Sequence, residues 1–107
     1  MVEIIYKRNS HSLRLQGHAG AGKPGNDLVC AAVSALALTL ADNVAQLTAQ
    51  GDVDRTLLRL ESGDSWVRCR SKGKMRPVVT LIFDSICEGF SLLQTLYPEH
   101  VSYKAQG

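Results

Sequence analysis

The stretch Asp27-Leu28-Val29-Cys30-Ala31-Ala32-Val33-Ser34-Ala35-Leu36 opens the segment that decides the fold of this chain. Apolar residues recur through it at three- and four-residue steps, the spacing that places side chains on one face of a helix. Asn26 or Asp27 is the predicted N-cap, and Gly51 suits the position just beyond a helix C-terminus. The sequence therefore predicts a helix that ends near Ala49 and buries Val29, Val33, Leu36, Leu40, Val44 and Leu47. A second face carries only small side chains, at Cys30, Ser34, Ala37 and Ala41.

Two predicted hairpins flank this helix. Residues 2–6 and 13–17 are the predicted strands of the first hairpin, joined by a polar turn at residues 8–11. Residues 53–60 and 66–70 form a second pair, turned at Ser62-Gly63-Asp64. A glycine-rich loop, residues 19–25, joins the first hairpin to the helix.

A second helix is predicted after the second hairpin. Pro77 suits its first turn, Pro98 stops it, and residues 101–104 are a candidate last strand. Its predicted buried stripe is Val79, Ile82, Phe83, Ile86, Phe90, Leu93 and Tyr97. The fold class expected is α+β, a two-layer ββαββα(β) domain with helices packed on a mainly antiparallel sheet.

Bulk properties bound the possible functions. A chain of 107 residues is expected to form one domain, residues 1–107, and its net charge of +2 does not demand a nucleic-acid or membrane partner. The weakly polar stretch at residues 28–40 is expected to be too short to span a bilayer. Cys30, Cys69 and Cys87 form no CxxC pair, and no signal segment is visible, which favours a reducing cytoplasm. The histidines and cysteines show no metal-ligand spacing, so neither a metal nor a cofactor is predicted.

Cys30 and His18 are the candidate catalytic residues. Cys30 falls in the first helical turn, where free backbone N–H groups and the helix dipole favour a thiolate. His18 follows a predicted strand, and the loop after it can fold back to bring the imidazole to the thiol. The non-catalytic alternatives are that Cys30 is a small buried hydrophobic residue and that His18 is an ordinary loop histidine.

Other residues near this pair are candidates for support. Asp27 is most simply a helix cap, and it is alternatively the carboxylate that orients His18. Ser34 lies one turn after Cys30 and either joins the site or bonds to its own helix. The loop is expected to order over a bound substrate, through Gly20, Gly22, Lys23 and Gly25.

A basic strand suggests a different kind of partner. Arg68, Arg70 and Lys72 alternate along the fourth predicted strand and continue into Lys74 and Arg76, while Arg55 and Arg59 come from the paired strand. Alternation would place several of these cations on one face, able to meet RNA or an acidic partner. A solvated face that discourages edge pairing accounts for the pattern equally well.

One segment resembles a known family signature. Gly17-His18-Ala19, Gly25, Asp27 and the run Val29-Cys30-Ala31-Ala32-Val33-Ser34 resemble the ribosomal-processing cysteine protease family Prp (YsxB-like), and length and element order are similar across the chain. The resemblance implies a homodimeric endopeptidase that removes the N-terminal extension of a bacterial large-subunit ribosomal protein, number twenty-seven. By position, Cys30 would be the nucleophile, His18 the general base and acid, and Asp27 and Ser34 supporting residues.

Two rival functions remain open from the sequence. One is a non-enzymatic ribosome-associated or RNA-binding assembly module that uses the basic strand face, so direct nucleic-acid binding is left undecided. The other is a thiol-based redox sensor, which the absence of a second cysteine near Cys30 weakens.

Overall fold

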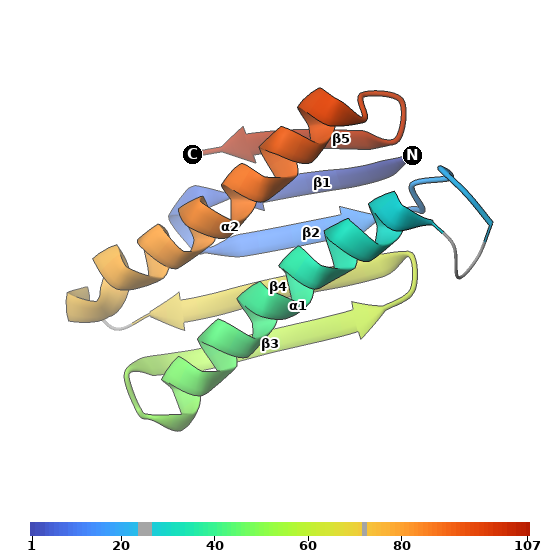
Figure 1. Cartoon of the computed structure of the whole chain (residues 1–107). Coiled ribbons are helices and arrows are strands. Elements are labelled where there is room, and N and C mark those ends of the chain that lie inside the picture. Colours follow the sequence, from blue (N-terminus) through green and yellow to red (C-terminus); the bar gives the residue numbers. More distant parts are fainter. Residues whose placement is uncertain (24–26, 72) are drawn as a thin grey trace.

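Two helices cover one face of a five-stranded sheet in this computed structural model, which describes residues 1–23, 27–71 and 73–107 (Figure 1). The strand order is β3-β4-β2-β1-β5. The strands are β1 (Val2–Lys7), β2 (Ser12–Gln16), β3 (Val53–Glu61), β4 (Asp64–Ser71) and β5 (Val101–Gln106). The helices are α1 (Leu28–Ala49) and α2 (Arg76–Leu96), and short 3-10 turns occupy Arg8–Ser10 and Gly73–Met75. The candidates Gly25, Asn26 and Lys72 lie outside the described residues.

The predicted α+β class is confirmed, and the sheet is mainly antiparallel. β1 pairs antiparallel with β2, and β4 pairs antiparallel with both β2 and β3. β5 runs parallel to β1, because α2 carries the chain back across the sheet before β5 begins. The backbone N–H of Val2 also donates to the carbonyl of His100, which ties the chain start to the segment before β5.

Alternating residues of the strands build the core beneath the helices. Val2, Ile4 and Tyr6 of β1 are buried, while the residues between them face outward. From α2, Phe83 and Phe90 are fully buried against this inner face of the sheet. One face of the sheet is therefore covered by α1 and α2.

Helix α1 begins and ends as predicted. The Asp27 side chain caps it by accepting a hydrogen bond from the Cys30 N–H, and Gly51 follows the last turn with a φ of +80°. The buried face is wider than the predicted stripe, because Ala37 and Ala41 are buried as well. Leu36 and Leu47 lie at the margin of the core and are only partly buried.

Helix α2 begins as predicted, with Pro77 in its first turn, but the residues at its C-terminal end and just before it differ from prediction. Tyr97 was expected in the buried stripe but is 40% exposed, because it caps the helix with non-helical backbone and no longer follows the helical period. Lys74 and Arg76 were expected to continue the fourth strand. They belong instead to the 3-10 turn and to the first turn of α2, because β4 ends at Ser71.

The expectation that the apolar segment at residues 28–40 is too short to span a bilayer was wrong. It is part of the 22-residue α1, and both α1 and the segment Gly73–Leu96 are long and apolar enough, by length and composition only, to cross a membrane. Here the apolar face of α1, centred on Val33, Leu40 and Val44, packs into the core. Core helices of this kind pass the same compositional test as membrane spans.

Candidate active site

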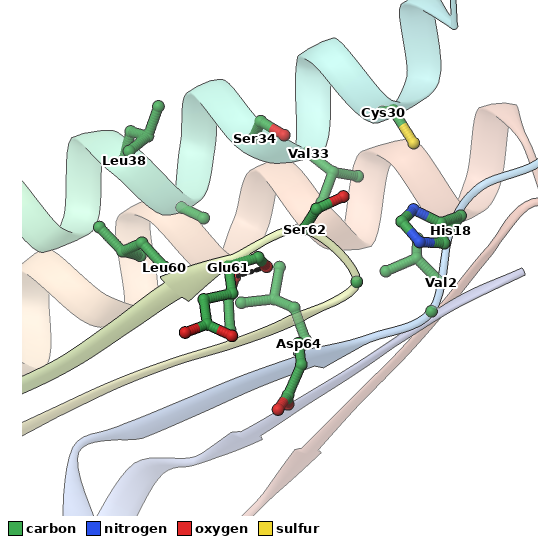
Figure 2. A pocket seen from close by; sticks show the side chains of 15 residues that line it. Val2, His18, Cys30, Val33, Ser34, Leu38, Leu60, Glu61, Ser62 and Asp64 are labelled. Atoms are coloured by element: carbon green, nitrogen blue, oxygen red, sulfur yellow. Dashed lines mark hydrogen bonds between the residues drawn. The ribbon is translucent and has the colours of Figure 1, made fainter. Parts of the chain in front are cut away.

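A cavity of about 320 Å³ lies where the start of α1 faces the end of β2 and the β3–β4 turn (Figure 2). Cys30, His18 and Ser34 all line it, so the structure brings together three of the predicted site residues. Leu38 and Leu60 supply an apolar wall, and the lining also includes Glu61, Ser62, Gly63 and Asp64. A cleft of this size with a thiol and an imidazole at one end is suited to a short stretch of extended peptide.

Cys30 is half-buried at the mouth of this cavity. Its position in the first turn of α1 follows from the Asp27 cap, which fixes where the helix starts. The backbone N–H of Ala19 donates to the Cys30 Sγ over 3.4 Å, so the loop does fold back onto the helix start as predicted. The Cys30 sulfur therefore lies at a helix N-terminus and accepts a hydrogen bond from the backbone of the loop.

Both carboxylate oxygens of Asp27 are used by the backbone. Oδ1 accepts from the Cys30 N–H at 2.9 Å, and Oδ2 accepts from the Ala21 N–H at 3.1 Å. These N–H groups hold the pKa of the Asp27 carboxyl below its ordinary value. Asp27 therefore joins the loop to the helix start and acts as the cap. The alternative contact, with His18, is not made in this arrangement, where both oxygens have backbone partners.

His18 lies in the cavity with its ring beside the β3–β4 turn (Figure 2). The Nε2 atom is so close to Gly63 that an added Cβ there would stand 2.7 Å away. The same turn holds the end of β2, because the Gly17 N–H donates to the Gly63 carbonyl at 2.9 Å. The His18 side chain is exposed, and among the described residues no hydrogen bond joins its ring to the Cys30 sulfur, which accepts from the Ala19 N–H instead.

The backbone donors around the sulfur already have partners. The Ala19 N–H bonds the sulfur, the Cys30 N–H bonds Asp27 Oδ1, and the Ala31 N–H bonds the Asp27 carbonyl. For one of these three groups to stabilise an oxyanion, it must change its acceptor during the reaction.

The remaining predicted residues have different places. Ser34 is exposed one turn along α1 from Cys30, where its side chain faces the cavity (Figure 2). Gly20, Gly22 and Lys23 are exposed in the loop and do not line the cavity. Gly20 has a φ of +69°, which its lack of a Cβ permits.

His100 joins the site although its sequence context did not predict it. Its Nδ1 lies 2.8 Å from the carbonyl oxygen of Ala19, so Nδ1 donates this bond, and Ala19 itself is 1% exposed. Ala19 is thereby fixed on both sides, by His100 at its carbonyl and by the Cys30 sulfur at its N–H. His100 is separated from Ala19 by 81 positions, and no local pattern marks the contact.

Replacing His100 with leucine is expected to slow alkylation of Cys30 by iodoacetamide at pH 7, and peptide cleavage with it, each by about 10-fold. The reason is that the Ala19 peptide loses the bond that aims its N–H at the sulfur. His100→Asn keeps an N–H donor near the Nδ1 position and should retain most of both rates. The neighbouring exposed Glu99→Gln is the matched control. Unchanged rates in a folded His100→Leu protein would contradict this role.

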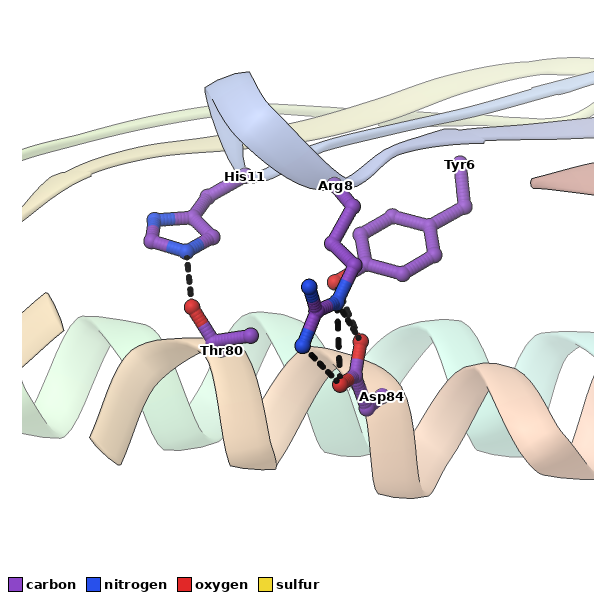
Figure 3. Close-up of polar contacts among 5 residues, drawn as sticks. All are labelled: Tyr6, Arg8, His11, Thr80 and Asp84. Carbon is purple, nitrogen blue, oxygen red and sulfur yellow. Dashed lines mark hydrogen bonds and ion pairs between the residues drawn. The ribbon is translucent and has the colours of Figure 1, made fainter. Parts of the chain in front are cut away.

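A second group of polar contacts lies at the other end of the first hairpin (Figure 3). Arg8 pairs with Asp84 over 3.1 Å, and the Tyr6 hydroxyl donates to the same carboxylate at 2.8 Å. The Arg8 guanidinium holds the pKa of Asp84 below its ordinary value. His11 is buried nearby, with Nε2 2.6 Å from the Thr80 hydroxyl oxygen. These contacts fasten the turn after β1 to α2 and do not reach the cavity at Cys30.

Buried His11 predicts a loss of stability in mild acid. Burial, and then the positive charge of Arg76, hold the pKa of His11 below its ordinary value of 6.5. The unfolded chain therefore binds a proton first, and stability is full above pH 6.5 and declines as the pH falls below it. Urea unfolding at pH 7.5 and pH 5 should show a larger loss in the wild type than in His11→Gln, which cannot titrate. Equal losses would contradict the assignment.

Comparisons with known proteins bear on the fold and the family of the chain. Residues 1–102 match the model of the family described as cysteine protease Prp. The essential ribosomal processing protease Prp from S. aureus, in complex with a covalently linked product peptide, superposes with a TM-score of 0.80 at 19% identity, over 99% of this chain and 100% of that chain. The same protease with a substrate peptide gives 0.67 at 19% identity, over 98% and 97%.

A third similar structure is SMU.848 from Streptococcus mutans, with a TM-score of 0.66 at 28% identity over 98% of this chain and 91% of that chain. No curated protein matches the chain significantly. At 19% identity, the structural likeness to the S. aureus protease supports the fold alone. The family model, by contrast, matches nearly the whole sequence and so supports membership of the family. On that match, this chain belongs to the cysteine protease Prp family.

Proposed function

We propose that this chain is a cysteine endopeptidase that removes the N-terminal extension of a bacterial large-subunit ribosomal protein, number twenty-seven. The observation that carries the proposal is the half-buried Cys30 sulfur at the start of α1, in one cavity with His18. Membership of the cysteine protease Prp family supports the chemistry. The substrate is taken from the family resemblance and from the S. aureus relative, a ribosomal processing protease.

The proposed reaction begins with attack of the Cys30 thiolate on the scissile carbonyl carbon. The carbonyl π electrons move to oxygen, and the Ala19 N–H, released from the sulfur as the charge leaves it, donates to this oxyanion. His18, carrying the proton taken from the thiol, gives it to the leaving amine as the C–N bond breaks. An acyl-enzyme thioester on Cys30 remains. The S. aureus relative, which holds a covalently linked product peptide, supports such an intermediate.

Hydrolysis of the thioester completes the proposed cycle. Neutral His18 removes a proton from water, the hydroxide adds to the thioester carbonyl, and the sulfur leaves as the thiolate. Through this cycle the Ala19 N–H changes its acceptor, from the Cys30 sulfur in the free protein to the oxyanion during attack.

A homodimer in the cytoplasm is also proposed, on the family resemblance. The outer surface of α2 supports self-association, because it exposes leucines along one side of the helix: Leu81, Leu92 and Leu96. Sedimentation velocity should give a species of twice the chain mass of 11.6 kDa. A protein that sediments as a monomer at micromolar concentration would contradict the dimer.

The experiment that tests the proposed function uses the ribosomal protein encoded in the same genome. A synthetic peptide covering its N-terminal segment is incubated with the full chain, and the products are identified by mass spectrometry. One cut between the extension and the mature N-terminus is the expected result, with a peptide of the same composition in scrambled order left intact. No cut, with protein whose Cys30 is still alkylated by iodoacetamide, would overturn the substrate assignment.

A further inference from the structure

The face of the sheet opposite the helices is open to solvent in the described part of the chain. Figure 1 shows α1 and α2 on the same side of the strands. The strand register places every second residue on the other side, beginning with Glu3, Ile5 and Lys7 of β1, opposite the buried Val2, Ile4 and Tyr6. This surface, called here the open sheet face, spans all five strands and does not include the thiol of Cys30.

Cations dominate the open sheet face. The register assigns four arginines of β3 and β4 to it: Arg55, Arg59, Arg68 and Arg70. Arg14 joins them from β2, paired across from Trp66, and Lys7 and Lys104 lie on β1 and β5. The acids that the register assigns to the same face are fewer, Glu3, Glu61 and Asp64, and they share one crosswise row at the end of the sheet near the cavity. Asp54 is also exposed on β3, but it lies at the irregularity between Val53 and Arg55 and has no register partner. Positive charge is thus concentrated here in a chain whose net charge is only +2.

Three of these arginines have no acidic partner among the described residues. The available carboxylates are taken by their neighbours, with Arg59 bonded to Glu61 at 2.9 Å and to Asp64 at 3.3 Å, and Arg14 at 4.0 Å from Asp64. Arg55 and Arg70 stand directly opposite each other across β3 and β4, and Arg68 is two residues along. Like charges in directly opposed positions destabilise a strand pair, so an anionic partner would relieve a cost built into the sheet.

An aromatic ring lies within this charged surface. Trp66 is half-buried on β4, and its register partners on either side are Arg14 of β2 and Arg59 of β3. Ile5 continues the same crosswise row on β1. The indole has guanidinium groups beside it, with Arg68 one row away and the facing pair of Arg55 and Arg70 two rows away. This is the combination that takes a base on the ring and phosphates on the cations.

From these observations we propose that the open sheet face binds single-stranded RNA, with Arg55, Arg68 and Arg70 holding backbone phosphates and Trp66 stacking on a base. RNA fits better than an acidic peptide because the face offers a stacking platform as well as cations. A second copy of this chain does not fit, since the same cluster of arginines would face itself. The surface is separate from the cavity at Cys30, so the proposal stands independently of the proposed protease reaction.

The chain supplies its own probe for a test, because Trp66 is its only tryptophan. Intrinsic fluorescence of the full chain is titrated with an oligouridylate of about 12 nucleotides, at several salt concentrations. Saturable quenching is expected, with log K falling against log salt at a slope of about −2, as three phosphate contacts to a single strand require. Arg68→Gln and Arg70→Gln should each weaken binding by about 10-fold or less at low salt, and together by more.

The controls distinguish RNA binding from acidic-protein binding and from a diffuse charge effect. Lys74→Gln removes one positive charge from the turn before α2, off the open sheet face, and should leave the titration unchanged. Cleavage by the Arg68→Gln/Arg70→Gln protein should equal that of the wild type. The absence of quenching by wild type up to about 100 µM RNA at low salt would overturn the proposal. If polyglutamate quenches the Trp66 fluorescence as strongly as RNA does, the proposal is overturned in favour of an acidic protein partner. If Lys74→Gln weakens RNA binding as much as the arginine variants do, it is overturned in favour of a diffuse charge effect.

Discussion

Replacing Cys30 with alanine, or His18 with alanine, is expected to lower peptide cleavage by roughly 10⁴- to 10⁶-fold, which puts it below detection. Cys30→Ala removes the nucleophile, and His18→Ala removes the only imidazole that lines the described cavity. Each residue lies at the edge of the core, so both variants should keep the melting temperature of the wild type within a few degrees. Cleavage is followed with the ribosomal-protein peptide, and folding by circular dichroism. Full activity in a well-folded Cys30→Ala protein would end the assignment.

The other two cysteines provide an internal control for this prediction. Cys69 and Cys87 are 2% and 1% exposed. Burial raises the pKa of the Cys69 thiol, and it raises that of Cys87 to about 12. Iodoacetamide at neutral pH should therefore modify Cys30 alone, and cleavage should be lost in step with that single modification. Loss of cleavage without label on Cys30 would point to a different nucleophile.

A methyl group at Gly63 is expected to reduce kcat/KM by about 10- to 100-fold. The Gly63→Ala Cβ would stand 2.7 Å from His18 Nε2, so the ring must leave its seat beside the turn. The turn also holds Gly17 through a hydrogen bond to the Gly63 carbonyl, and any shift of the turn is passed to the strand end that carries His18. The loss should appear mainly in kcat, because the imidazole acts in the chemical steps.

Gly51→Ala is the matched control for this variant. Gly51 and Gly63 have φ values of +80° and +76°, so alanine costs about 1–2 kcal/mol of backbone strain at either position. The space around a Cβ at Gly51 is open, and the residue follows the far end of α1 from the cavity. The two variants should therefore lose similar stability in thermal melts, while only Gly63→Ala loses activity. Equal activities in the pair would show that the position of the His18 ring does not matter.

Local patterns predicted much of the fold. The apolar spacing after Asp27 located α1, and Pro77 located the first turn of α2, because helix capping and periodicity depend on neighbours in sequence. The same locality placed Cys30 in the first helical turn and the glycine-rich loop beside it. Prediction from local patterns failed at Tyr97, where the backbone is no longer helical, and at Lys74, which follows β4 because that strand ends earlier than expected.

The rest of the site depends on topology that no local pattern encodes. The contact of His100 with Ala19 exists because β5 returns to lie parallel beside β1. Gly63 meets His18 because β4 pairs with β2, which sets the β3–β4 turn against the end of the first hairpin. The arrangement of the basic residues likewise depends on the strand register, which sets Arg55 opposite Arg70 and could not be read from either strand alone.

Identification of the acyl-enzyme is the most direct test of the central claim, that the Cys30 sulfur attacks the peptide bond. The full chain is mixed with the ribosomal-protein peptide, quenched in acid within the first turnover, digested and mapped by mass spectrometry. A thioester to the N-terminal product fragment is expected on Cys30 in the wild type, and none is expected in His18→Ala, because His18 acts in the formation of the thioester as well as in its hydrolysis. Cleavage without any such adduct, or an adduct mapped to Cys69 or Cys87, would contradict the account.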